Sequence, residues 1–150
     1  MIFEFERDFA GTMRCIPMVV RFNLDLCGIK LSLKQWSRIG RENRAKLAQV
    51  GCIMDRQIQA YSDMVVSLIE AVPHQDVVYL KCDMETPWED PTRVPDQVHA
   101  FAASSGIDGI EWTAWSTLTR LQRFAIYKLT RASHDNDNFC PALKEFGLLE

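Results

Sequence analysis

The chain has 150 residues, of which 47% are hydrophobic and 25% are charged, and its formal net charge is −3. This length suits one domain with a sizeable core, because two halves of about 75 residues would each be only marginally stable. No apolar run approaches the roughly 18 residues of a membrane helix. The opening "MIFEFERDF" alternates apolar and acidic residues, unlike a signal or transit peptide. We therefore expect a single cytoplasmic domain over residues 1–150.

The composition gives little support to nucleic-acid binding, metal binding or a known catalytic motif. A net negative charge argues against general nucleic-acid binding, which needs many Lys and Arg contacts to phosphate. There is no C-x-x-C pair and no G-x-G-x-x-G, Walker or G-x-S-x-G motif. Widely spaced thiols are typical of reduced, buried cysteines, whereas a zinc site needs closely spaced ligand pairs. We expect neither a cofactor nor a metal. The cysteines and histidines are Cys15, Cys27, Cys52, Cys82, Cys140, His74, His99 and His134.

The first strong helix signal runs from Pro17 to Gly28. Pro17 suits the first helical position, because its missing N–H would be unbonded there in any case. Val20, Leu24 and Cys27 follow at helical spacing, and Gly28 suits a left-handed cap at the helix end.

Capping signals predict two further helices. Ser32 and Gln35 form a capping box, in which side chain and backbone satisfy each other's free groups, so a short helix is expected over 33–39. Gly40 suits the N-cap of a new helix that begins at residue 41.

A longer helix and an irregular connector follow. Apolar side chains at helical spacing predict a helix within "IMDRQIQAYSDMVVSLIEAV". Its stripe consists of Met54, Ile58, Tyr61, Val65 and Leu68. Prolines and acids make the segment of about 72–94 an irregular connector, in which "VVYL" is a candidate short strand.

The second half of the chain repeats the helix and capping signals of the first. Residues 94–107 align with 16–29, with Pro95 and Gly106 in the places of Pro17 and Gly28. The "WS" at 115–116 then aligns with the "WS" at 36–37. Helices are expected over 111–118 and from residue 120, where a capping box of Thr119 and Gln122 precedes the second. A last helix carries Phe139, Leu143 and Phe146 and stops at Gly147.

We interpret this pattern as one unit written twice, over about 14–71 and 94–147. Two similar helical hairpins that arose by chance are the alternative, but cap, length and Arg spacing agree together, which favours duplication. The predicted fold is all-α, a single bundle of six to eight helices with at most a short strand in the connector.

Two arginine pairs are the candidate binding residues. Arg41 and Arg44 align with Arg120 and Arg123, and each pair is spaced to lie on one helix face. Paired guanidinium groups are suited to a carboxylate or phosphate on a partner or ligand. In the structural alternative, these arginines cover apolar surface and pair with acids of the connector.

Other candidate residues favour structural roles. Cys15 lies beside Arg14, but no histidine is placed near it, so a buried thiol is expected rather than a nucleophile. The "HDNDN" run at 134–138 lacks the glycine and distal glutamate of a calcium loop and predicts a solvated turn. Trp36, Trp112 and Trp115 fall at core spacing and are expected inside the bundle.

Three blocks, "FEFERDF", "RCIPMVVRFNLDLCGIKLSLKQW" and "LQRFAIYKLTR", together resemble the nitrate reductase-associated protein family of small bacterial proteins. The resemblance runs from Phe3 to the C-terminus and is densest over 14–36 and 112–131. It implies a link to nitrate assimilation and brings no catalytic residues with it. Asn23 stands where relatives are expected to have a basic residue, which argues against an anion site on the helix after Pro17.

The leading hypothesis is a non-enzymatic cytoplasmic accessory protein that binds a larger partner, such as nitrate reductase or its maturation machinery. The runner-up is a helical protein that binds a small ligand, an anion or a metal within the bundle. A DNA-binding helix-turn-helix over 95–118 is a third reading, which the acidic connector opposes. A homodimer is compatible with the sequence.

Overall fold

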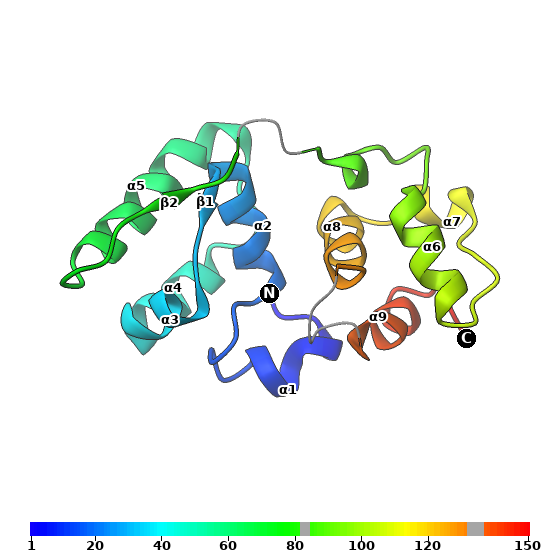
Figure 1. Cartoon of the computed structure of the whole chain (residues 1–150), viewed down its shortest axis with the longest axis horizontal. Helices are drawn as coiled ribbons and strands as arrows, with labels where there is room; N and C mark the ends of the chain where they lie inside the picture. Colours follow the sequence, from blue (N-terminus) through cyan, green and yellow to red (C-terminus); the bar gives the residue numbers. More distant parts are fainter. Residues whose placement is uncertain (82–84, 132–136) are drawn as a thin grey trace. The chain divides into compact units, whose positions relative to one another are not determined.

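The computed structural model describes residues 1–81, 85–131 and 137–150 (Figure 1). The chain forms two compact units, unit 1 (Met1–Met84) and unit 2 (Glu85–Glu150). Helices dominate both, which confirms the predicted all-α class. The boundary between the units falls inside the predicted connector. In the described ranges, no helix is long and apolar enough to cross a membrane.

Unit 1 contains a short antiparallel sheet among its helices (Figure 1). Its elements are η1 (Glu4–Glu6), α1 (Arg7–Ala10), α2 (Met18–Cys27), β1 (Ile29–Lys30), α3 (Leu33–Arg38), α4 (Arg41–Gln49), η2 (Asp55–Gln57), α5 (Ile58–Glu70) and β2 (Val78–Tyr79), where η marks a 3₁₀ turn. The candidate strand in "VVYL" is confirmed as β2, and its partner β1 was not expected. In the register of this pair, Ile29 faces Tyr79 and Lys30 faces Val78.

Helix α2 is central to unit 1 and packs against α5 and α4. Pro17 is its N-cap with an extended backbone, so the prediction that Pro17 occupies the first helical position is wrong by one residue. The first helical N–H therefore belongs to Met18, and the buried carboxylate of Glu6 accepts it at 3.0 Å from N to Oε2. Gly28 ends the helix with φ 69°, the left-handed cap that the sequence predicts.

Helix α5 begins later than its predicted stripe. Met54 precedes the 3₁₀ turn η2 and is 60% exposed, so its placement in the core was wrong. The turn breaks the helical register before Ile58, and the buried side chains are those of Tyr61, Val65 and Ile69. Ile69, rather than Leu68, therefore completes the stripe that faces α2.

Unit 2 is built around α8 (Figure 1). Its elements are η3 (Pro87–Glu89), α6 (Asp96–Ser104), α7 (Trp112–Ser116), α8 (Arg120–Leu129) and α9 (Phe139–Glu145). Helix α8 contacts η3, α6 and α9, and its buried Phe124 meets Trp88 edge to face with ring centroids 5.2 Å apart. Phe139 belongs to the apolar stripe that the sequence predicts for the last helix. Its ring packs on that of Phe101, with the ring centroids 4.8 Å apart.

The predicted breaks between short and long helices are confirmed in both units. Ser32 accepts the backbone N–H of Gln35 and caps α3 as predicted, and Gly40 is the N-cap of α4. In unit 2, Thr119 accepts the N–H of Gln122 and caps α8. Local capping chemistry therefore sets these helix starts.

Trp112 does not join the core. Trp36 and Trp115 are fully buried, as predicted, whereas Trp112 is 56% exposed. Trp112 is the first residue of α7, and the buried residue of that helix is Trp115. Helical spacing was a poor guide here, because α7 contains only five residues.

Candidate functional site

The predicted arginine pair of unit 1 is divided between the interior and the surface. Arg44 donates from Nη1 to the carbonyl of Met13 at 2.8 Å, and the indole N–H of Trp36 donates to the same carbonyl at 2.7 Å. These two side chains come from α4 and α3, and together they hold the segment that leads into α2. Arg41 is exposed and has no hydrogen-bond or ion-pair partner among the described residues.

The equivalent residues of unit 2 also donate to main-chain carbonyls, although not to a shared one. The indole N–H of Trp115 donates to the carbonyl of Asp90 at 3.0 Å. Arg123 donates from Nε to the carbonyl of Trp88 at 3.0 Å and from Nη1 to that of Leu118 at 2.7 Å. We call each Trp and Arg set, with the main chain it binds, a clasp.

The clasp of unit 2 is the more deeply buried of the two. Arg123 is 8% exposed, whereas Arg44 is half-buried. Burial lowers the pKa of the Arg123 guanidinium, and the charge of Glu89 opposes that shift. A buried guanidinium that satisfies two main-chain carbonyls is a structural group, because little of it remains for a ligand.

Arg120 pairs with the acidic connector, as the structural alternative expects. Its Nη2 lies 2.6 Å from Oε1 of Glu89, and its Nε donates to Oε2 of the same carboxylate at 2.8 Å. The guanidinium also lies over the Trp88 ring, 5.8 Å from the centroid. The contact is bidentate and partly buried, so it fixes η3 against the start of α8.

Arg41 is the last of three exposed cations that follow one another closely in the sequence of unit 1. Lys34 and Arg38 are one helical turn apart on α3, and Arg41 follows after the break at Gly40. We call Lys34, Arg38 and Arg41 the basic face. None of the three has a hydrogen-bond or ion-pair partner in the part of the chain that is described, whereas nearby Lys46 pairs with Glu42 at 3.5 Å.

Cysteine chemistry gains no support from the described residues. The Cys27 thiol donates to the Ile58 carbonyl at 3.6 Å, and burial raises its pKa to about 11, which keeps it protonated and unreactive. Cys15 is half-buried. Within residues 1–81, 85–131 and 137–150, no group of three His, Cys, Asp or Glu side chains is placed to hold a metal ion. Cys82 and most of the predicted turn at 134–138 lie outside those residues.

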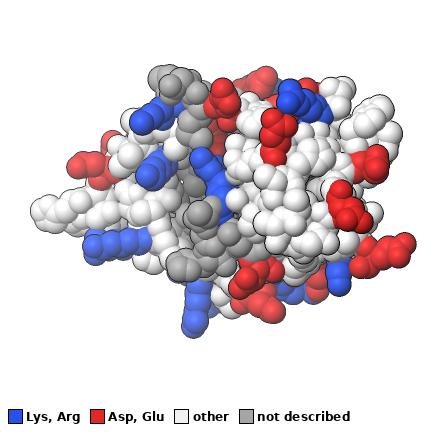
Figure 2. Space-filling view, turned by 45° about the vertical axis from the view of Figure 1, so that its right-hand side comes forward, with Lys and Arg blue, Asp and Glu red and all other residues white. Residues whose placement is uncertain are grey.

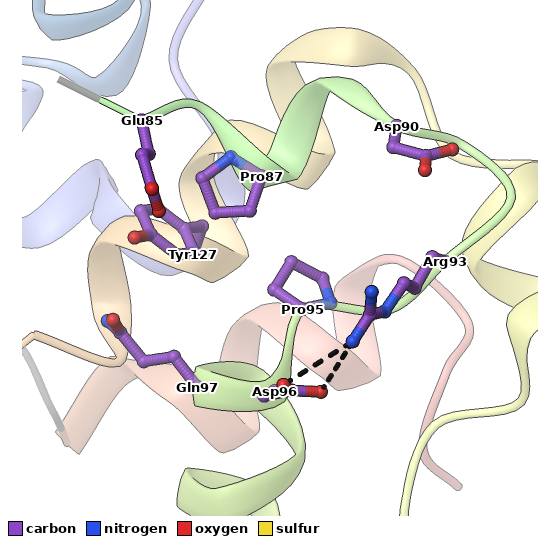
Figure 3. Close-up of a pocket in the computed structure, with 8 residues that line it drawn as sticks. All are labelled: Glu85, Pro87, Asp90, Arg93, Pro95, Asp96, Gln97 and Tyr127. Carbon is purple, nitrogen blue, oxygen red and sulfur yellow. Dashed lines mark hydrogen bonds and ion pairs between the residues drawn. The ribbon is translucent and has the colours of Figure 1, made fainter. Parts of the chain in front are cut away.

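A cavity of about 410 Å³ opens on unit 2 (Figure 3). Pro87 and Pro95 face each other across it, with the Tyr127 ring of α8 beside them. The Arg93 and Asp96 side chains, 3.3 Å apart from Nη2 to Oδ1, form one end. No sequence motif marked this cavity, because most of its lining comes from the mostly irregular segment 85–97 and Tyr127 joins it from α8.

Charges of both signs lie on the surface. The face drawn in Figure 2 carries Lys and Arg as well as Asp and Glu side chains, separated by uncharged residues. By unit, the sequence places eleven Lys and Arg against ten Asp and Glu in unit 1, and six against ten in unit 2. The excess of negative charge therefore belongs to unit 2.

The sequence model of the conserved nitrate reductase-associated protein family matches residues 2–146. The chain belongs to that family. The match covers nearly the whole chain and confirms the resemblance in the three sequence blocks. The family description links the chain to nitrate reductase. No curated protein and no solved structure matches the chain significantly.

The blocks that carry the family resemblance build the scaffold. In "FEFERDF", the Glu6 carboxylate binds the N–H groups of Phe3 and Met18, and the Phe3 and Phe5 rings stack at 5.5 Å. In "LQRFAIYKLTR", Arg123 belongs to a clasp and the buried apolar side chains of α8 form the core of unit 2. These contacts give residues of both blocks a structural role.

Asn23 is a structural residue that the sequence did not reveal. It is fully buried on α2, where its Nδ2 donates to the Gly51 carbonyl at 2.7 Å and its Oδ1 accepts the Ile53 N–H at 3.0 Å. These bonds hold the loop after α4 against α2. An isolated asparagine within an apolar helix is the signal that indicates such a role, because a buried amide needs partners.

Proposed function

We propose that the chain is a non-catalytic cytoplasmic accessory protein that binds a larger protein partner in nitrate assimilation, either nitrate reductase or its maturation machinery. Membership of the nitrate reductase-associated family is the observation that carries this proposal. A family described by its association, together with sequence blocks whose residues hold the scaffold, is consistent with a binding role.

The basic face is the surface that we assign to the partner. Of the four arginines predicted as binding residues, Arg44, Arg120 and Arg123 have internal partners, and Arg41 has none among the described residues. Arg41 continues into Lys34 and Arg38, so three cations present their charges to solvent within eight residues. Cations without an internal acid favour an acidic surface on a partner, and they steer its approach.

The basic face can be tested by charge reversal. Lys34→Glu, Arg38→Glu and Arg41→Glu, combined in one variant, should weaken binding to purified nitrate reductase by at least about a hundredfold, since several interface charges turn repulsive. The measurement is biolayer interferometry at two ionic strengths, with circular dichroism to show that the helices persist.

A matched variant separates local from overall charge. Arg14→Glu, Arg56→Glu and Lys81→Glu change the net charge of unit 1 by the same amount at exposed positions. This variant should bind within about threefold of the wild type, because it changes the net charge of unit 1 without reversing any charge of the basic face. Equal loss in both variants, or none in the first, would show that the basic face is not the interface. No binding by the wild type to nitrate reductase or to its maturation proteins would refute the proposed function.

A further inference from the structure

The cavity on unit 2 combines an apolar wall with a carboxylate at one end (Figure 3). The rings of Pro87, Pro95 and Tyr127 supply the wall. Glu85 stands at the end of the cavity beside Tyr127, is exposed, and has no hydrogen-bond or ion-pair partner in the described residues. A carboxylate that stays unpaired beside an aromatic ring and two prolines is available to a ligand.

The positive charge in the lining is already neutralised. Arg93 is paired with Asp96, so it does not offset Glu85. Asp90, also in the lining, accepts the backbone N–H and the hydroxyl of Thr92 at 2.8 and 2.6 Å, and these bonds hold its pKa below the ordinary range. The cavity is therefore negative at neutral pH and repels anions.

The aligned positions of unit 1 are buried. The sequence alignment pairs Pro95, Gln97 and Tyr127 with Pro17, Val19 and Ala48. Val19 and Ala48 are buried, 1% and 3% exposed, and belong to the core. Gln97 and Tyr127 in unit 2 are polar and accessible from the cavity. In unit 1 these positions stabilise the fold as part of a closed core. The fold therefore does not require the open, polar arrangement of the same positions in unit 2, and we look for a role in binding.

We propose that this cavity binds a cationic side chain, an arginine or lysine of a partner polypeptide. The methylene stem of the side chain lies against Pro87, Pro95 and Tyr127, and its charged head meets Glu85. A metal ion is a poorer occupant, because no three acidic, histidine or cysteine side chains of the described residues converge on one point. A cavity of about 410 Å³ has room for an extended side chain with its flanking backbone.

This inference concerns unit 2 alone and does not depend on the basic face or on nitrate reductase. Its test uses N-acetyl-arginine amide as the probe and N-acetyl-citrulline amide, which has the same shape without the charge, as the control. The full chain is titrated with each, and NMR follows the Gln97 side-chain amide and the backbone amides of the lining. We expect saturable shifts with the arginine probe, with a dissociation constant on the order of 1 mM for a ligand of this size.

Two carboxylate variants locate the binding. Glu85→Gln should raise the dissociation constant of the arginine probe by roughly fivefold, which is the upper end of the effect of an ion pair on a protein surface. Glu111→Gln removes an exposed carboxylate of unit 2 that does not line the cavity, and should leave affinity unchanged. The proposal is overturned by the absence of a saturable shift with the arginine probe, by equal binding of citrulline, or by equal loss in both variants.

Discussion

Units 1 and 2 share an internal clasp and differ in what they expose. In each unit, a tryptophan and an arginine donate to main-chain carbonyls near the segment that leads into a Pro-capped helix. They are Trp36 and Arg44 in unit 1 and Trp115 and Arg123 in unit 2. Unit 1 exposes three cations on its basic face that have no partner in the described part of the chain, whereas unit 2 has the greater excess of acids and a cavity lined by acidic side chains. The matching tryptophan and the second matching arginine of each unit bind main chain inside the fold, whereas the surface charge differs between the units and is the better guide to binding.

This comparison supports the proposal that the two units arose by duplication. The aligned tryptophans and the second arginine of each pair make the same kind of bond, although the sequence alignment used only their order and spacing. Aligned core positions agree as well, since Val20 and Val98 are both fully buried. Such agreement in contacts is harder to obtain by chance than agreement in helix punctuation.

The largest expected effect separates the clasp tryptophan from its exposed neighbour. Trp115→Ala should reduce the free energy of unfolding by about 4 kcal/mol, because it leaves a large cavity and an unpaired Asp90 carbonyl. Trp112→Ala, one helical turn away, should cost less than about 1 kcal/mol, since much of that side chain is already in water. Urea denaturation measures both. Similar losses would mean that Trp112 packs in the core, as helical spacing alone predicts.

A smaller effect compares the glutamates that precede the two Pro-capped helices. Glu6→Ala should cost about 2 kcal/mol, because the buried Met18 N–H loses its charged acceptor. Glu85→Ala should leave stability nearly unchanged, because Glu85 is exposed and has no partner among the described residues. Thermal unfolding monitored by circular dichroism checks both variants. If Glu85→Ala destabilises the chain as much as Glu6→Ala, the Glu85 carboxylate stabilises the fold. It would then not be available to bind a cationic side chain in the cavity.

Local chemistry predicted most of the helices, and long-range contacts account for the errors. The caps at Ser32, Thr119 and Gly28 are encoded within a few residues, so the sequence placed them correctly. The bond from Met18 to Glu6 spans twelve residues and leaves no periodic signal. Met54 was misplaced because a 3₁₀ turn interrupts the register that the stripe assumes.

The candidate site was predictable only in part. The spacing of the four arginines could be read directly from the sequence. The acidic connector supplies the partner of Arg120, as the structural alternative expects. Which arginine of a pair turns inward depends on where carbonyls of other segments lie, which no pattern within the helix reveals. The cavity was missed for the same reason, since Glu85, Pro95 and Tyr127 meet only in the fold.

The most direct test of this division between scaffold and surface replaces the four arginines singly with methionine, which keeps the helix propensity and much of the stem. The free energy of unfolding in urea should fall by about 3 kcal/mol for Arg123→Met, whose loss leaves two buried carbonyls without donors. The fall should be smaller for Arg44→Met and then Arg120→Met, and Arg41→Met should stay within about 0.5 kcal/mol of the wild type. A loss for Arg41→Met equal to that for Arg44→Met would contradict the account, because both arginines would then belong to the scaffold.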